Sequence, residues 1–209
     1  LKDVNFSVEQ GEYVAIMGES GSGKSTLLNI LAALDKPTEG KVFLKEKDLS
    51  KVKEKEMAEF RRNNLGFVFQ DFNLLDTFSL KDNIFLPLVL SGTSHKEMER
   101  RLLPLADKLG IKNLLEKYPY EVSGGQKQRL ILSRNLITNP NILIIDNGFT
   151  GLDIDTRKKV VDNLNNRNNK TTLVIISSMM EDIKNADKIY KLENKALVEM
   201  NMEEEVYDA

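Results

Sequence analysis

A glycine-rich segment near the start of the chain constrains the fold more than any other part of the sequence. Residues 18–25 (GESGSGKS) follow an apolar run, Tyr13–Met17, and precede a helical pattern over residues 25–34. A buried strand, a glycine-rich turn and a helix start in this order cradle phosphate, because glycine lets backbone N–H groups turn toward the anion and the helix adds its positive end. The sequence therefore predicts a phosphate loop.

The spacing within this loop assigns roles to its last residues. Lys24 is placed to reach the β- and γ-phosphates of a nucleotide, and the Ser25 hydroxyl is placed to hold Mg²⁺. A glycine-rich turn with a chance lysine is the alternative, and the flanking strand and helix argue against it. The residues predicted to bind ATP are Gly18, Glu19, Ser20, Gly21, Ser22, Gly23, Lys24, Ser25 and Thr26.

A second oxygen ligand for the metal is expected at the end of another buried strand. Residues 142–145 are apolar and rich in isoleucine, and Asp146 follows them directly. A carboxylate that ends a strand beside a phosphate loop is placed on the Mg²⁺ side of the nucleotide. An aspartate here could instead form a turn or cap a helix, but the phosphate loop favours the metal ligand.

The rest of the pattern alternates strands with helices, which indicates an α/β fold with a mostly parallel sheet. We predict strands over 42–44, 65–69 and 173–176, helices over 48–62, within 72–119, from 124 and over 156–164, and a loop over 163–170. The expected architecture is a phosphate-loop NTPase core with an antiparallel β edge and an inserted helical lobe. It forms a single domain, 1–209, with the core at about 1–70 and 140–209 and the lobe at about 71–139.

Composition narrows the chemistry. The chain has no cysteine, one histidine (His95), and 30 basic against 32 acidic residues. Thiol catalysis and multi-histidine metal centres are therefore excluded, and nucleic acid is not expected as the main partner. No apolar run approaches the roughly 20 residues that span a bilayer, and no signal-peptide profile opens the chain, so we expect a cytoplasmic protein. Because the sequence opens on Leu1, we expect an upstream stretch to be missing.

A second motif separates this chain from other phosphate-loop proteins. Residues 122–129 (VSGGQKQR) resemble the signature motif of ATP-binding cassette (ABC) transporter ATPases. Gln70 matches the Q-loop of that family, and Gly151-Leu152-Asp153 matches its D-loop. Residues 53–87 (KEKEMAEFRRNNLGFVFQDFNLLDTFSLKDNIFLP) resemble the bacitracin-type peptide-antibiotic exporters, whose relatives include lipoprotein-release, macrolide-efflux and cell-division ATPases.

The resemblance implies two subunits that sandwich two ATP molecules. Each ATP lies on the phosphate loop of one subunit and is capped by the signature motif of the other. Ser123, Gly124, Gly125 and Gln126 would then meet the γ-phosphate at a helix start, although Ser123 could also serve only as a helix cap. Gln70 would be a metal ligand and a catalytic residue. The implied partners are a second ABC subunit, identical or different, and an integral membrane permease at the cytoplasmic face of the plasma membrane.

Three residues at two sites depart from the pattern of the family, one of them Gly148 in place of the usual proline. The glutamate that polarises the attacking water is replaced by Asn147, and the histidine that contacts the γ-phosphate is replaced by Ser178. His95 precedes the signature motif and is expected at the surface, at the start of a helix. An amide cannot accept a proton from water, and a general base contributes about 10²–10⁴-fold in rate. We therefore expect MgATP binding with slow or absent turnover.

Three hypotheses about function follow from these motifs. The leading one is the ATP-binding subunit of an ABC transporter, either degenerate or paired with a subunit that carries the competent site. The alternative is a non-hydrolysing ATP-dependent regulatory or scaffold protein, which Asn147 and Ser178 favour. An ordinary phosphate-loop kinase or GTPase is disfavoured by the signature motif.

The adenine contact is a further open point. Members of the family stack the base on an aromatic residue well upstream of the phosphate loop. The aromatic residues that precede the loop here, Phe6 and Tyr13, fall in strand patterns. Either the stacking segment lies upstream of Leu1, or adenine is held loosely.

Overall fold

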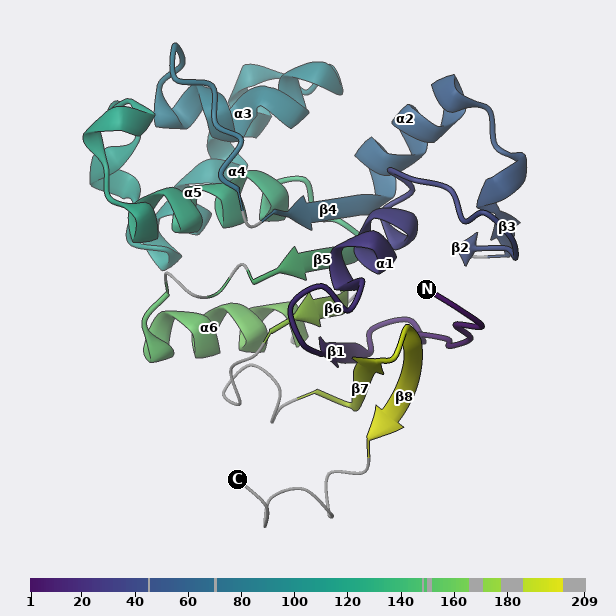
Figure 1. The fold of residues 1–209 in the computed structure, drawn as a ribbon. Coiled ribbons are helices and arrows are strands. Elements are labelled where there is room, and N and C mark those ends of the chain that lie inside the picture. The colour runs from purple at the N-terminus through teal and green to yellow at the C-terminus, as the bar shows by residue number, and fades with distance from the viewer. Residues whose placement is uncertain are drawn as a thin grey trace.

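The computed structural model is built on a six-stranded sheet (Figure 1). The structure describes residues 1–44, 46–69, 71–147, 149, 152–165, 171–177 and 186–200. Every neighbouring pair of strands in this sheet is parallel except β7 and β8, so the predicted α/β class with a mostly parallel sheet and an antiparallel edge is confirmed. In spatial order the strands are β4 (Leu65–Val68), β5 (Ile142–Asp146), β6 (Thr172–Ile176), β1 (Tyr13–Met17), β7 (Lys188–Glu193) and β8 (Ala196–Met200).

The central strands are buried on both faces, and β1 shows how the sheet separates two cores. Tyr13 and Ala15 point into one core and Val14 and Ile16 into the other, because successive residues of a strand face opposite sides. The second core also contains Leu27 and other residues of helix α1 (Lys24–Leu31). Parallel strands covered on both faces are expected to be apolar throughout, which explains the continuous apolar runs in the sequence.

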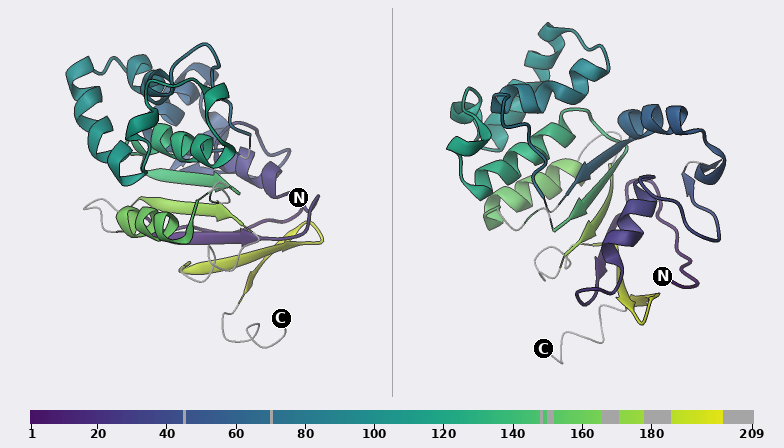
Figure 2. Two further views of the ribbon diagram at one scale, coloured as in Figure 1. Left: turned by 90° about the vertical axis from the view of Figure 1, so that its left-hand side faces the viewer. Right: turned by 45° about the horizontal axis from the view of Figure 1, so that its top comes forward.

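Three helices of the lobe cover the other face of the sheet (Figure 2). They are α3 (Leu80–Leu90), α4 (His95–Lys108) and α5 (Gly124–Leu136). Leu88, Leu102 and Leu130, one from each helix, are at most 2% exposed and pack in the same core as Leu143 of β5. Helix α6 (Ile154–Asn165) joins this core through Val160. None of the described helices combines the length and the hydropathy needed to cross a bilayer.

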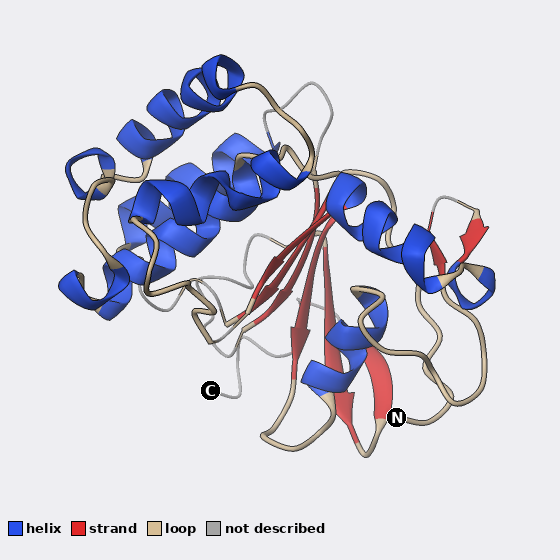
Figure 3. Cartoon of the chain, turned by 90° about the horizontal axis from the view of Figure 1, so that it is seen from above, coloured by secondary structure: helices blue, strands red, loops and turns tan. Residues whose placement is uncertain are grey.

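A small hairpin and one helix lie at the other side of the molecule from the lobe (Figure 3). The hairpin pairs β2 (Phe43–Leu44) with β3 (Lys47–Asp48), and helix α2 (Glu54–Asn64) leads directly into β4. Three short 3₁₀ turns complete the described elements: Leu49–Lys51, Lys112–Leu114 and Pro119–Glu121.

Several predicted boundaries were wrong. The helix expected over 48–62 begins only at Glu54, because Asp48 ends β3 and its carboxylate caps the 3₁₀ turn by accepting from the Ser50 N–H at 3.0 Å. The helix expected over 25–34 ends at Leu31. The loop expected from residue 163 begins later, since α6 continues to Asn165 and tertiary context overrides the weak helix propensity of asparagine. Residues 166–170 of that predicted loop lie outside the described residues.

Candidate nucleotide-binding site

The phosphate loop lies between β1 and α1, at the carboxyl edge of the parallel strands, where α/β proteins bind ligands. Gly18 turns the chain directly after β1 with φ +151°, and a Cβ at this position would lie 2.6 Å from the carbonyl oxygen of Leu192. Gly23 has φ +108° and is the N-cap of α1. The first N–H groups of a helix lack acceptors within the helix, so this turn presents donors and a positive helix end to an anion.

Lys24 is the first residue of α1, and its side chain folds back over the loop. Its Nζ donates to the carbonyl oxygens of Gly18 at 2.8 Å and Glu19 at 2.6 Å, and to Ser22 Oγ at 3.5 Å. These bonds hold the half-buried ammonium inside the curve of the loop. The cation therefore lies where phosphate oxygens would replace carbonyl oxygens as its partners.

Ser25 and Asp146 are distant in sequence and meet beside the loop. Ser25 Oγ donates to Asp146 Oδ2 at 3.4 Å, and the strands that lead to the two residues are separated in the sheet only by β6. The pKa of the Asp146 carboxyl is raised, because the effect of burial exceeds the opposing effects of the bond from Ser25 and the charge of Lys24. A hydroxyl and a carboxylate at this spacing fit Mg²⁺, which takes oxygen ligands and is usually held by one or two carboxylates together with phosphates.

Asn147, at the position of the expected catalytic glutamate, has an unusual backbone. Its φ is +50°, in the left-handed region that asparagine tolerates better than most residues. The side-chain Nδ2 donates to Asp146 Oδ1 at 3.3 Å, and the backbone N–H donates to the Ile176 carbonyl oxygen at 3.0 Å. The amide thus contacts the candidate metal ligand as a donor and offers no proton-accepting carboxylate.

The signature residues form the N-terminal turn of α5. Ser123 and Gln126 make a reciprocal capping box: the Ser123 N–H donates to Gln126 Oε1 at 3.0 Å, and the Gln126 N–H donates to Ser123 Oγ at 3.4 Å. The alternative role of Ser123 as a helix cap is therefore real. Ser123 and Gly124 are also exposed, so the same helix start is open to a ligand from outside the chain.

The two predicted halves of the ATP site lie on opposite faces of the sheet. Helix α1, which begins with Lys24, packs in one core, and α5, which begins after Ser123, packs in the other. In the part of the chain that the structure describes, no hydrogen bond or ion pair joins residues 123–126 to residues 18–26. One copy of the chain therefore does not bring the signature motif to its own phosphate loop.

Asp153 of the predicted D-loop precedes α6 and caps it. Its carboxylate accepts from the Thr156 N–H at 2.9 Å and from the Thr156 hydroxyl at 2.7 Å. The backbone bond from Thr156, followed by the bond from its hydroxyl, lowers the pKa of the Asp153 carboxyl. The geometry assigns Asp153 a structural role in its own chain and leaves its side chain at the surface.

Two buried side chains that sequence reasoning left without a role hold the segment after Asp146. Gln128 Nε2 donates to the Asn147 carbonyl oxygen at 3.4 Å, and Arg157 Nη2 donates to the Phe149 carbonyl oxygen at 3.0 Å. Gln128 is 7% exposed and Arg157 6%. The burial of a long polar side chain within the signature run could have signalled Gln128, whereas no local pattern points to Arg157.

Some predicted residues are not placed, and one is placed away from the site. Gln70, Ser178 and Gly151 lie outside the described residues. His95 begins α4 in the lobe with its side chain 72% exposed, and its Nε2 lies 3.7 Å from Glu99 Oε1. As expected, the only histidine of the chain is a surface residue at a helix start.

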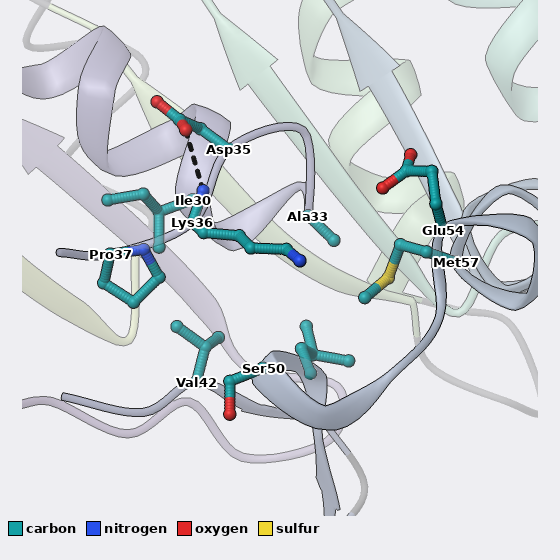
Figure 4. Close-up of a pocket in the computed structure, with 10 residues that line it drawn as sticks. Ile30, Ala33, Asp35, Lys36, Pro37, Val42, Ser50, Glu54 and Met57 are labelled. Carbon is teal, nitrogen blue, oxygen red and sulfur yellow. Dashed lines mark hydrogen bonds between the residues drawn. The ribbon is translucent and has the colours of Figure 1, made fainter. Parts of the chain in front are cut away.

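The aromatic residues that precede the loop are engaged elsewhere. Phe6 lies outside any strand, unlike the prediction, and its ring packs edge-on against Tyr190 at 5.5 Å, while Tyr13 is 1% exposed. The small hollow drawn in Figure 4 lies at the far end of α1 from Lys24 and so is not the phosphate site. Its lining residues are Ile30, Ala33, Asp35, Lys36, Pro37, Val42, Leu49, Ser50, Glu54 and Met57.

The fold and the loop together define a phosphate-loop nucleotide-binding protein. Residues 1–150 match the family model described as ABC transporter. The chain is 44% identical over 179 residues to the ABC transporter ATP-binding protein YxdL of Bacillus subtilis, a match that covers 85% of this chain and 70% of that protein. It is 42% identical over 176 residues to the bacitracin export ATP-binding protein BceA of Halalkalibacterium halodurans, over 84% of this chain and 70% of that protein.

A solved structure agrees with these relatives. The dimeric post-hydrolysis state of the ATP-binding cassette MJ0796 bound to ADP and Pi matches with a TM-score of 0.89 and 34% identity, over 96% of this chain and 90% of that one. The chain belongs to the ABC transporter ATP-binding family, and the predicted resemblance is confirmed.

Proposed function

We propose that this chain is the MgATP-binding subunit of a membrane transporter, that it dimerises around ATP, and that its own hydrolysis is weak. The observation that carries the proposal is the separation of an ordered phosphate loop from an exposed signature turn on the opposite face of the sheet. A second subunit can complete the site that one chain leaves open, as the dimeric cassette MJ0796 illustrates.

Binding rests on residues with distinct tasks. The N–H groups at the start of α1 and the Lys24 ammonium would hold the phosphate oxygens, and Ser25 with Asp146 would hold Mg²⁺. The metal, when bound, neutralises charge on the β- and γ-phosphates. The exposed Ser123 and Gly124 of the partner would close the site over the γ-phosphate, and closure excludes water from it.

Weak hydrolysis is proposed from Asn147. Its amide donates to Asp146 and cannot take a proton from an attacking water. Enzymes turn over at about 10 per second as a median, and loss of a general base costs about 10²–10⁴-fold. A rate of roughly 0.001–0.1 per second follows for the chain alone. The substitution of histidine by Ser178 removes a second γ-phosphate contact that the family resemblance implies.

A permease partner is proposed from the relatives and from the surface of the lobe. BceA is a bacitracin export ATP-binding protein, and its match covers most of this chain. Large apolar side chains stand exposed on the segments around the start of α3: Leu75, Phe78, Tyr118 and Tyr120. The rings of Tyr118 and Tyr120 stack at 5.7 Å, with Tyr120 72% exposed. Apolar surface of this kind fits a protein contact.

A regulatory or scaffold role without transport is the second candidate, and Asn147 is the observation that favours it. The two candidates differ in their partner. Purification of the chain with an integral membrane protein supports the transporter subunit, whereas an ATP-dependent assembly of soluble proteins alone supports the scaffold.

Phosphate release from the purified chain under saturating MgATP tests the catalytic part. We expect a rate of phosphate release far below one per second in the unaltered chain. In Lys24→Ala we expect nucleotide binding itself to be lost. Asn147→Glu combined with Ser178→His should raise the rate if only those two groups are missing. Turnover of several per second in the unaltered chain would refute weak hydrolysis. Size measurement with and without ATP tests dimerisation separately.

A further inference from the structure

Two neighbouring arginines in the last turn of α2 bind the C-terminal ends of two different helices. Arg61 Nη1 donates to the carbonyl oxygen of Ala33, two residues beyond the end of α1, at 2.8 Å. Arg62 Nη1 donates to the carbonyl oxygen of Leu90, the last residue of α3, at 2.9 Å. One helix turn therefore contacts both the helix that carries the phosphate loop and the first helix of the lobe.

The chemistry of these contacts suits helix ends. The last carbonyl groups of a helix lack N–H donors within it and carry the negative end of the helix dipole. A guanidinium is always charged and gives a charge-assisted hydrogen bond to such a carbonyl. Arg62 thus bonds the end of α3 and Arg61 bonds the turn after α1, and because the two arginines are adjacent, these two segments are tied to each other through α2.

The end of α2 that carries the two arginines is anchored to the sheet. The Asn141 N–H donates to the Asn64 carbonyl oxygen at 3.0 Å, and Asn141 Nδ2 donates to Asn64 Oδ1 at 3.0 Å, which binds the end of α2 to the residue before β5. Asn64 Nδ2 also donates to the Phe60 carbonyl oxygen at 2.9 Å. Helix α2 cannot tilt at this end without breaking its two bonds to Asn141.

The two tied helices lead to the two halves of the proposed ATP site, α1 directly and α3 through its packing against α5. Helix α1 begins with Lys24, and α3 packs against α5, which begins after Ser123. Ile84 of α3 and Ile131 of α5 are at most 1% exposed and belong to one core. A shift of α3 therefore moves α5, since close-packed helices transmit displacement.

We propose that Arg62 is a positioning residue for the ATP-bound dimer: by holding the end of α3 against α2, it sets the orientation of the lobe and of the Ser123 turn relative to the phosphate loop. The inference rests on the proposed function, because the orientation matters only when Ser123 reaches a partner's ATP. Among the described residues predicted to bind the nucleotide, none is hydrogen-bonded to Arg62, so it acts through α3 and α5. Arg61 makes the corresponding contact to the segment after α1, the helix that begins at the phosphate loop.

Spin-label distances give a test that does not depend on dimerisation. The chain has no cysteine, so labels at Lys96→Cys in α4 and Val198→Cys in β8, both exposed positions, report the lobe against the core without background. In nucleotide-free protein, Arg62→Ala should broaden or shift this distance distribution. Arg100→Ala is the matched control, because Arg100 pairs with Glu97 of its own helix. An unchanged distribution in Arg62→Ala would overturn the proposal.

Binding measurements separate positioning from general damage. With Arg62→Ala, ADP affinity should stay within twofold of the unaltered chain, while the dissociation constant of the dimer formed with MgATP should rise at least tenfold. Arg62→Lys, which keeps the charge, should recover part of the loss and serves if Arg62→Ala fails to fold. Equal dimerisation in all variants overturns the proposal. If the unaltered chain itself forms no dimer with MgATP, the part of the proposed function that pairs the chain with a second copy of itself fails, and the spin-label result still shows whether Arg62 orients the lobe.

Discussion

At position 147 the side chain and the backbone favour the same residue. The left-handed φ of +50° suits asparagine, and the amide donates to Asp146 at 3.3 Å. A glutamate here would place a second carboxylate beside Asp146. It would also have to adopt the left-handed backbone conformation, which destabilises L-residues other than glycine, asparagine and aspartate by about 1–2 kcal/mol. Asparagine at this position removes the candidate general base, and it also avoids the backbone strain and the second carboxylate.

Restoring the glutamate should therefore lower stability. We expect Asn147→Glu to reduce the free energy of unfolding by about 1 kcal/mol or more, through backbone strain and repulsion of Asp146. Denaturant unfolding without Mg²⁺ measures this. Asn147→Asp is the matched control, since aspartate also carries a charge but tolerates the left-handed region better. If glutamate and aspartate destabilise equally, charge repulsion alone explains the loss and the backbone argument is wrong.

Individual residues differed in how well their sequence neighbourhood predicted them. Lys24 and Ser25 occur in a segment whose backbone conformation is set locally by glycines and a helix start, so spacing predicted their place. Gln128 and Arg157 bind carbonyl groups of a segment 19 and 8 residues away along the chain, respectively. No periodic pattern encodes such contacts, because they depend on how α5 and α6 pack beside β5.

Helix starts connect the elements to the site. Helix α1 begins at a glycine N-cap that leaves its donors to a ligand, whereas α5 and α6 begin at Ser123 and Asp153, whose side chains cap their own helices. A carboxylate at a helix start is stabilised in its charged form by N–H donors and by the positive helix end. This explains the lowered pKa of Asp153.

The cap of α6 predicts a pH dependence of stability. A carboxyl whose pKa is lower in the folded protein stabilises it above the ordinary pKa, near 3.8, and this contribution is lost as pH falls through the lowered folded pKa. Asp153→Asn keeps an oxygen acceptor but no charge. We expect it to be less stable than the unaltered chain at pH 7, with the difference shrinking below the ordinary pKa. Denaturant unfolding between pH 7 and pH 3 measures this, and a constant difference would contradict the cap.

At the scale of the whole molecule, ligand binding should raise the melting temperature. A ligand at one hundred times its dissociation constant adds about 2.7 kcal/mol to stability. In a domain of this size that corresponds to a shift of about 5–10 °C. We expect MgATP to give such a shift in the unaltered chain and none in Lys24→Ala, measured by differential scanning fluorimetry. A shift retained by Lys24→Ala would place the nucleotide away from the phosphate loop.

The order of the strands explains why one chain forms only half of each proposed site. Strands β1 and β5 end at the same edge with β6 between them, which brings Asp146 to Ser25 across 121 residues. The same sheet separates α1 from α5, since each packs on a different face. Assembly of the proposed site thus requires a second subunit, and contacts such as Arg62 with Leu90 set how the first presents its lobe.

The sequence by itself predicted the α/β class, the phosphate loop and the carboxylate at the end of β5, because each depends on local spacing and on apolar periodicity, and it predicted the signature turn through resemblance to the ABC family. The tertiary structure alone decided which of these groups meet. It joined Ser25 to Asp146, put Lys24 and Ser123 on opposite faces, and set the left-handed backbone at Asn147. The physical reason is that strand order and helix packing are properties of the whole chain, and short segments do not encode them.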